Sequence, residues 1–315
     1  MPIVLASQAG SEFDELAAAH PAVEAVIPLS LDDHILDHVT QQADALIVRP
    51  GPMWKAIAER GRPAQWPGRI RWVQSTSAGV DYYPGWLAEA PWFSCGRGVA
   101  SDQIADYVVG AIYAHVKDFG QLSIRSREEW KPVAQRSVIG RTVAILGLGS
   151  IGRAIAARVR ALGAIPIGVR RSPGVDEDVE LVATLEDAVA IADDIVIALP
   201  ATGETRGIVN AALLAKAKPG AHLINIARGS IVDQEALLAA LDDGRIGFAT
   251  LDVTDPEPLP AGHRLYAHPL VRITPHLSSN WQTVIPTLHR QLIENIEAVA
   301  NDRAPANLVL AARGY

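Results

Sequence analysis

Cysteine is nearly absent from this chain, and basic residues are fewer than acidic ones. The single cysteine, Cys95, rules out an intrachain disulfide and provides no second thiol for a redox pair or a cysteine zinc cluster, so we expect it to be free and buried. The 28 Lys and Arg residues against 35 Asp and Glu give a formal net charge of -7. That balance provides no basic field for a nucleic-acid backbone, so we expect no nucleic-acid partner.

Long apolar runs are also missing. No run approaches the roughly 20 residues that a membrane-spanning helix needs, and the first six residues lack the basic and apolar regions of a signal peptide. We therefore expect a cytoplasmic protein with no membrane partner. Hydrophobic residues make up 49% of the 315 residues, which is enough to bury two cores, and this length favours two domains.

Short apolar runs alternate with helical stretches along the whole chain, which is typical of an α/β fold with parallel sheets. A helical pattern from Ile104 to His115 separates an early series of runs from a later one. The early runs are 2–6, 25–29, 45–48, 70–74 and 92–94. The six later runs are 143–146, 165–169, 195–199, 222–227, 248–253 and 271–274, with helices predicted at 210–217, 234–241 and 288–299.

These two series predict two Rossmann-like or flavodoxin-like domains, each a doubly wound parallel sheet. Because the early series lacks a closing helix, we expect the C-terminal tail to return to it. The cofactor domain, 100–284, is then inserted into a substrate-binding domain formed by 1–99 and 285–315.

A glycine-rich turn follows the first run of the later series. Gly147-Leu148-Gly149-Ser150-Ile151-Gly152 is a G-x-G-x-x-G sequence that directly follows the apolar run 143–146 and opens a helical pattern. Glycines permit a tight turn and a close backbone approach, and the N–H groups that open a helix bind a pyrophosphate. The strand, turn and helix together predict a dinucleotide-binding loop, with Gly147, Gly149, Ser150, Ile151 and Gly152 as cofactor-binding residues.

The next predicted strand ends without the acidic residue that would bind the ribose hydroxyls of NAD. It ends in Arg170-Arg171-Ser172, whose guanidinium and hydroxyl groups suit a 2′-phosphate. A solvated basic turn is the alternative interpretation. We expect NADP(H) to be preferred, with NAD(H) possible.

Three polar residues follow the ends of later strands. Arg228 comes after run 222–227, Glu257 after run 248–253, and His276 after run 271–274. Ligands bind outside the carboxyl ends of the strands in such sheets, so we expect the three to converge. Taken singly, each could be an ordinary loop residue.

The three residue types suit the reduction of a 2-keto acid. An arginine fork can bind the carboxylate and polarise the neighbouring carbonyl, which is the role predicted for Arg228. The new alkoxide needs a proton donor with a pKa near neutrality, and His276 fits that need. Glu257 would bind the other ring nitrogen and favour the imidazolium. No second histidine or cysteine stands at ligand spacing near His276, so we expect no metal.

These segments resemble the D-isomer-specific 2-hydroxyacid dehydrogenases. The resemblance rests on residues 225–233, on Leu251-Asp252-Val253 with Glu257-Pro258-Leu259, and on Thr274-Pro275-His276, in the family's order and spacing. It covers essentially the whole chain and implies the catalytic roles of Arg228, Glu257 and His276. It also implies a homodimer built around the helix and loop at 100–140. The further cofactor contacts that it implies are Leu199, Pro200, Thr205, Ile226, Ala227, Asp252 near the nicotinamide carboxamide, and Ser279.

The first domain contains Ser77-Ala78-Gly79-Val80-Asp81, which is similar to the family's loop for the substrate carboxylate. The resemblance implies that the backbone of Ala78, Gly79 and Val80 binds substrate, and Arg49, at the end of run 45–48, is a further candidate. Trp130-Lys131-Pro132 and the terminal residues 312–315 look like the NADPH-linked glyoxylate/hydroxypyruvate reductases. In those enzymes the loop tryptophan can reach the partner's active site, so Trp130 lines a shared pocket or is buried in a dimer interface.

The sequence therefore predicts a reductase of a small 2-keto acid, with a homodimer as the expected assembly. Two alternatives stay open. One is a dinucleotide-sensing binding protein of the co-repressor type, which would act through a protein partner. The other is an NAD-linked dehydrogenase for a bulkier keto acid, which residues 170–171 disfavour.

Overall fold

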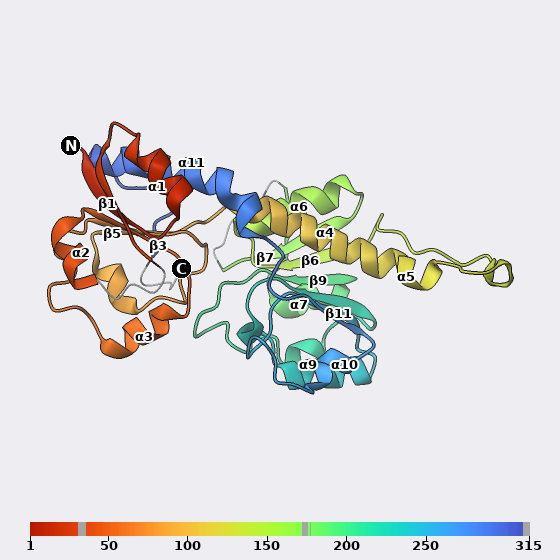
Figure 1. Ribbon diagram of the computed structural model, residues 1–315. Coiled ribbons are helices and arrows are strands. Elements are labelled where there is room, and N and C mark those ends of the chain that lie inside the picture. Colours follow the sequence, from red (N-terminus) through yellow and green to blue (C-terminus); the bar gives the residue numbers. More distant parts are fainter. Residues whose placement is uncertain (31–35, 172–175, 177, 311–315) are drawn as a thin grey trace. The chain divides into compact units, whose positions relative to one another are not determined.

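The computed structural model describes residues 1–30, 36–171, 176 and 178–310. The chain forms two compact units (Figure 1). Unit 1 consists of Met1–Val99 together with Trp281–Tyr315, and unit 2 consists of Ala100–Asn280. Unit 2 is thus inserted into the sequence of unit 1.

Unit 1 is built on a five-stranded parallel sheet in the order β2-β1-β3-β4-β5. Its strands are β1 (Ile3–Ser7), β2 (Val23–Pro28), β3 (Ala45–Val48), β4 (Trp72–Ser75) and β5 (Trp92–Ser94). This is the strand order of flavodoxin-like sheets, in which the carboxyl ends of all strands meet at one edge. Arg49 and Ser77 follow β3 and β4 at that edge.

Helices cover both faces of this sheet. Figure 1 shows α1 (Ser11–Ala18) and α11 (Trp281–Ala300) beside each other, and the rings of Phe13 and His289 lie 5.5 Å apart. Helices α2 (Leu36–Gln42) and α3 (Met53–Arg60) and the short helix η1 (Gly85–Glu89) pack against Val48 and Val73 in a separate core.

The C-terminal segment belongs to unit 1. Leu308 forms a bridge with Ser94, and the N–H of Cys95 donates to the carbonyl of Asn307 (3.1 Å). Cys95 is 1% exposed, as expected for a free thiol in a core, and burial raises its pKa. Residues 312–315 lie outside the described part of the chain. No helix within the described ranges is long and apolar enough to cross a membrane.

Unit 2 begins with α4 (Ser101–Lys117), followed by α5 (Phe119–Leu122) and η2 (Arg127–Glu129). Its seven-stranded parallel sheet has the order β12-β11-β10-β9-β6-β7-β8. The strands are β6 (Thr142–Leu146), β7 (Ile165–Val169), β8 (Glu180–Leu181), β9 (Asp194–Ile197), β10 (Ala221–Asn225), β11 (Ile246–Leu251) and β12 (Val271–Ile273). The connecting helices are α6 (Ser150–Ala161), α7 (Leu185–Ile191), α8 (Ala211–Leu214), η3 (Gly229–Ile231), α9 (Gln234–Asp242) and α10 (Arg264–Ala267).

Side chains of β6 alternate between two cores, because successive residues of a strand point to opposite faces. Val143 and Ile145 join the core formed with α4 and α6, and Ala144 and Leu146 join the core formed with α7, α8 and α9. The sheet is therefore doubly wound, and the predicted fold class is confirmed. The predicted count of six strands was wrong: β8 has only two residues, one of them Glu180, and such a short polar edge strand has no apolar run.

Candidate active site

The glycine-rich turn lies between β6 and α6. Gly147 has φ +108°, and a Cβ on it would lie 2.6 Å from the carbonyl oxygen of Ala198. A Cβ on Gly152 would lie 2.2 Å from the carbonyl oxygen of Gly147. Gly149 caps α6 and has open space where its side chain would be, so a ligand can approach the backbone closely there. The turn, the helix N-terminus and this open space fit a bound pyrophosphate.

Arg170 and Arg171 follow β7, one strand away from the glycine turn. The Nε atom of Arg170 is buried and has no hydrogen-bond partner among the described residues. An unpaired buried donor is costly, and a phosphate oxygen would satisfy it. Arg171 pairs with Glu204 at 2.5 Å on the surface. Ser172 lies outside the described residues.

Two further loops at the same edge contain the other predicted cofactor contacts. Leu199 and Pro200 follow β9, and the hydroxyl of Thr205 donates to the carbonyl of Pro200 (2.6 Å), which ties that loop together. Ile226 is buried after β10, and the N–H of Ala227 donates to Asn225 Oδ1 (3.1 Å). Both loops therefore have fixed backbones at the edge where the glycine turn lies.

The structure brings His276 and Glu257 together. The Nδ1 atom of His276 lies 3.2 Å from Glu257 Oε2, and both side chains are 40% exposed. Nε2, the other ring nitrogen, is the one left to face a substrate. A carboxylate on Nδ1 fixes the tautomer and stabilises the imidazolium, so this pair can hold and release a proton.

Arg228 follows β10, and the residue after it packs against the loop that carries Glu257. The Nδ2 atom of Asn225 donates to the carbonyl of Arg228 (3.0 Å), and Arg228 Nη1 donates to the carbonyl of Ala227 (2.8 Å). A Cβ on Gly229 would lie 1.9 Å from the carbonyl carbon of Thr254, so this turn packs directly on the 254–257 loop. The three predicted catalytic residues thus follow neighbouring strands, β10, β11 and β12, of one sheet.

Asp252 lies below the His276 loop. Its side chain is fully buried, and its two carboxylate oxygens accept hydrogen bonds from the N–H groups of Leu277 (2.8 Å) and Ser278 (2.9 Å). Ser279, a predicted cofactor contact, follows this segment and is partly exposed. The carboxylate therefore stabilises the backbone that carries His276.

In unit 1, the loop after β4 presents a series of backbone donors. Among the described residues, nothing accepts a hydrogen bond from the N–H groups of Ala78, Gly79 or Val80. The hydroxyl of Ser77 holds the Gly79 carbonyl (2.6 Å), and Ser75 Oγ lies 3.1 Å from Ser77 Oγ. Successive N–H groups in a turn can bind an anion.

Arg49 lies at the same edge of the unit 1 sheet. Its guanidinium carbon stands 4.1 Å from the centre of the Trp281 ring, and its N–H donates to Gln8 Oε1 (3.1 Å). The cation–π contact holds the guanidinium in place.

Trp130 follows η2, and its side chain is 79% exposed. So exposed an indole is unusual in a folded chain, and the structure of one chain gives it no pocket. Its predicted contact with a partner subunit stays a prediction.

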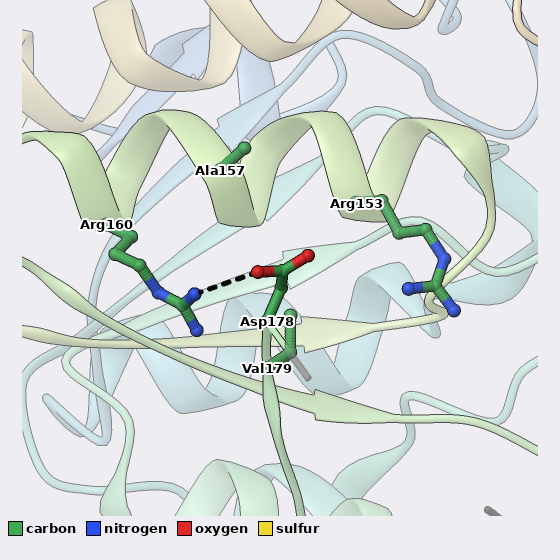
Figure 2. A pocket seen from close by; sticks show the side chains of 5 residues that line it. All are labelled: Arg153, Ala157, Arg160, Asp178 and Val179. Carbon is green, nitrogen blue, oxygen red and sulfur yellow. Dashed lines mark hydrogen bonds and ion pairs between the residues drawn. The ribbon is translucent and has the colours of Figure 1, made fainter. Parts of the chain in front are cut away.

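A surface pocket of about 260 Å³ lies along α6 and is lined by none of the predicted site residues. Figure 2 shows Arg160 pointing to Asp178 across it, at 3.4 Å. Arg153 pairs with Asp176 nearby; burial disfavours that carboxylate, but the N–H of Asp178 and the Arg153 guanidinium outweigh it and lower the pKa of Asp176. Because its two arginines already have carboxylate partners, we assign no role to this pocket.

Sequence reasoning did not select three residues that shape the site. Asn225 was detectable, because it is a polar residue at the end of a buried apolar strand. Thr274 belongs to the Thr274-Pro275-His276 segment, but its residue type alone indicated no role. Tyr107, on α4, lies within 2.6 Å of Thr274 Oγ1 although 167 residues separate the two, and no local pattern signals such a contact.

Comparison with known proteins agrees with this architecture. Residues 109–278 match the family model of the D-isomer specific 2-hydroxyacid dehydrogenase, NAD binding domain. The chain is 34% identical over 260 residues to a glyoxylate/hydroxypyruvate reductase A of Serratia proteamaculans, covering 79% of this chain and 82% of that protein.

Solved structures agree over the full length. A D-isomer specific 2-hydroxyacid dehydrogenase from Xanthobacter autotrophicus Py2, in complex with NADPH and MES, is 30% identical with a TM-score of 0.82, covering 100% of this chain and 99% of that one. An NADPH-dependent glyoxylate/hydroxypyruvate reductase from Sinorhizobium meliloti, in complex with NADP and sulfate, is 26% identical with a TM-score of 0.80, covering 99% of each chain. The chain is therefore an NAD(P)-binding oxidoreductase that belongs to the D-isomer-specific 2-hydroxyacid dehydrogenase family.

Proposed function

We propose that this enzyme reduces a small 2-keto acid of the glyoxylate or hydroxypyruvate type to the D-2-hydroxy acid, with NADPH as the preferred cofactor. The observation that carries the proposal is the pairing of His276 with Glu257 at 3.2 Å, on the sheet edge that also carries the glycine turn. A proton donor and a dinucleotide site on one edge are what hydride reduction of a carbonyl requires.

The bound nicotinamide would supply a hydride to C2 of the keto acid. In this chain, the N-terminus of α6 and the 147–152 turn would hold the pyrophosphate. Asp252 would lie near the nicotinamide carboxamide, and Ser279 would be a further cofactor contact. The buried, unpaired Nε of Arg170 supports a 2′-phosphate and therefore NADPH. The relatives solved in complex with NADPH and with NADP support the same preference.

His276 would donate the proton that the developing alkoxide takes up, from Nε2. Glu257, on Nδ1, would keep the ring in the charged form before the transfer and hold its orientation after it. Arg228 would bind the substrate carboxylate and polarise the carbonyl through its planar fork. In the oxidative direction the same histidine accepts the proton.

Unit 1 would supply the remaining contacts with the substrate carboxylate. The three N–H groups of Ala78, Gly79 and Val80 would bind the carboxylate, and Arg49, at the end of β3 on the same sheet edge, would be a further contact. We assign glyoxylate or hydroxypyruvate because the relative from Serratia proteamaculans is named for those substrates.

The proposal includes a homodimer formed through α4 and the loop up to residue 140. The exposed indole of Trp130 supports it, because a second chain would cover that side chain. Sedimentation analysis of the wild type and of Trp130→Ser measures this. A monomer at micromolar concentration would contradict the proposal.

The test of the proposed reaction is nucleotide oxidation at 340 nm with glyoxylate, hydroxypyruvate, pyruvate and phenylpyruvate, each with NADPH and with NADH. We expect turnover with glyoxylate and hydroxypyruvate when NADPH is the cofactor. His276→Ala should lower kcat by a factor of roughly 100 or more. A fast NADH reaction with phenylpyruvate would support the NAD-linked alternative. Absence of turnover with every pair, together with tight nucleotide binding, would support a sensing protein instead.

A further inference from the structure

The backbone of His276 is held in an unfavourable conformation. Its φ is +51°, in the left-handed region that non-glycine residues rarely adopt. The N–H of His276 lies 2.9 Å from the carbonyl oxygens of both Asp252 and Thr274. A backbone of this kind persists only where surrounding contacts determine it.

The carboxylate of Asp252 provides those contacts. It accepts hydrogen bonds from Leu277 N and Ser278 N, as described above, and from the hydroxyl of Thr274 at 2.6 Å. The side chain is 0% exposed, and no ion pair among the described residues neutralises it. A buried carboxylate without a cation is stable only if its hydrogen bonds are complete, so each of these donors matters.

The direction of the next hydrogen bond follows from counting donors. A threonine hydroxyl has one proton, and an ionised carboxylate can only accept, so Thr274 donates its proton to Asp252. The hydroxyl of Tyr107, 2.6 Å from Thr274 Oγ1, must then donate to Thr274. Burial raises the pKa of Tyr107, with the hydrogen bond to Thr274 opposing it, so the phenol keeps its proton at neutral pH.

We propose that Tyr107 and Thr274 are positioning residues that act through Asp252 to hold His276 in register with Glu257. The chain of hydrogen bonds runs from α4 to Thr274, then to Asp252, and from Asp252 to the segment on both sides of His276. This inference rests on the proposed function of His276 as proton donor, but the contacts themselves lie within unit 2 and need no ligand.

Thr274→Val and Thr274→Ser form the main test. Valine keeps the shape but removes the hydroxyl, whereas serine retains it. We expect Thr274→Val and Tyr107→Phe to lower kcat about 10-fold or more, with the KM for NADPH within about twofold of wild type. Thr274→Ser should restore most of the rate. A wild-type kcat for Thr274→Val would overturn the inference, and so would a change in the cofactor KM alone, which would show that the hydroxyl acts on cofactor binding and not on His276.

Thr250→Val is the matched control. Thr250 is equally a threonine of this sheet, is 1% exposed, and its hydroxyl lies 2.9 Å from Nε2 of His222, away from His276. This variant should lose comparable stability but keep kcat. Equal loss of kcat in Thr250→Val and Thr274→Val would show a merely structural effect.

The imidazole nitrogen resonances of His276, followed by NMR and assigned with His276→Gln, report which ring nitrogen carries the proton and need no turnover. The contact of Nδ1 with Glu257 favours the tautomer with the proton on Nδ1. Loosening that contact in Thr274→Val should therefore raise the fraction of the neutral ring with its proton on Nε2. Unchanged resonances would overturn the positioning role. Changed resonances in an enzyme that turns over no keto acid would instead retain the positioning and reject the proposed function.

Discussion

Acid should destabilise unit 2 through two neighbouring histidines, His222 on β10 and His115 on α4. His222 is fully buried, with Nδ1 3.1 Å from Asp194 and its ring centre 4.5 Å from that of His115. Arg141 already pairs with Asp194 at 2.8 Å, so that carboxylate offers little charge to a protonated imidazole. Burial lowers the pKa of His222, and burial with the neighbouring His222 and Arg136 charges lowers the pKa of His115 to about 3.

The sign of the effect follows from these directions. Between pH 7 and pH 5 the unfolded histidines, with a pKa of about 6.5, take up protons that the folded ones do not. The free energy of unfolding therefore decreases as the pH is lowered. For the fully buried His222 this amounts to about 2 kcal/mol over that interval. We expect about 1 kcal/mol from His115, because its partial exposure to solvent screens the effect. Asp194, whose pKa is lowered by its hydrogen bonds to His222 and Arg141 despite burial, loses its contribution only at lower pH.

Hydrogen exchange of the amides of β10 (221–225) at pH 7 and pH 5, corrected for the intrinsic rate, measures this loss of about 3 kcal/mol. The amides of β3 in unit 1 are the internal control, since Asp14 there has a pKa raised by burial and titrates in the opposite sense. His115→Phe keeps a ring against Phe248, 5.2 Å away in the wild type, and should remove about 1 kcal/mol of the pH dependence. Equal protection of the β10 amides at both pH values would refute the assignment of His222 and His115 as neutral in the folded state.

The remaining predictions concern the cofactor and the proton donor. Gly152→Ala should weaken NADPH binding about 10-fold or more in a fluorescence titration, because its Cβ would collide with the backbone, whereas Gly85→Ala, with open space at Cβ, should bind normally. Arg170→Ser should lower kcat/KM for NADPH by about 10-fold or more and leave that for NADH within about twofold; equal losses for both cofactors would remove Arg170 from phosphate recognition. Glu257→Gln should move the alkaline limb of the kcat profile for reduction to lower pH, because the neutral amide no longer favours the imidazolium; an unmoved limb would contradict the pairing.

Much of the fold was predictable because buried parallel strands are continuous apolar runs. The strand ends were less predictable. The run 222–227 predicted a strand that ends later than β10. The strand ends at Asn225, whose side-chain oxygen accepts a hydrogen bond from the N–H of Ala227. The run 248–253 also extends past β11, which ends at Leu251. The N–H of Asp252 still donates to the Asn225 carbonyl (3.0 Å), and the side chain of Asp252 accepts hydrogen bonds from the His276 loop.

The gathering of Arg228, Glu257 and His276 at one sheet edge could be predicted because strand ends converge in such a sheet, whatever the side chains. The pairing of His276 and Glu257 needed only the order of strands and the chemistry of the two residues. The role of Tyr107 could not be predicted, because its partner Thr274 lies 167 residues later in the sequence. Whether the two side chains meet depends on how α4 packs on the folded sheet. The surroundings of Trp130 depend on a second chain and stay a prediction.

The insertion of unit 2 into unit 1 has a consequence for synthesis on the ribosome. Residues 100–280 are continuous and can fold as soon as they emerge, because their sheet needs no later segment. Unit 1 cannot be completed at that stage. The buried Gln74 Oε1 accepts hydrogen bonds from Ser94 Oγ and from Asn295 Nδ2 (2.8 Å), and Asn295 lies on α11, 221 residues after Gln74. Until α11 is made, α1 alone covers its side of the first sheet, so unit 1, whose first segment precedes unit 2 in the sequence, is completed after it.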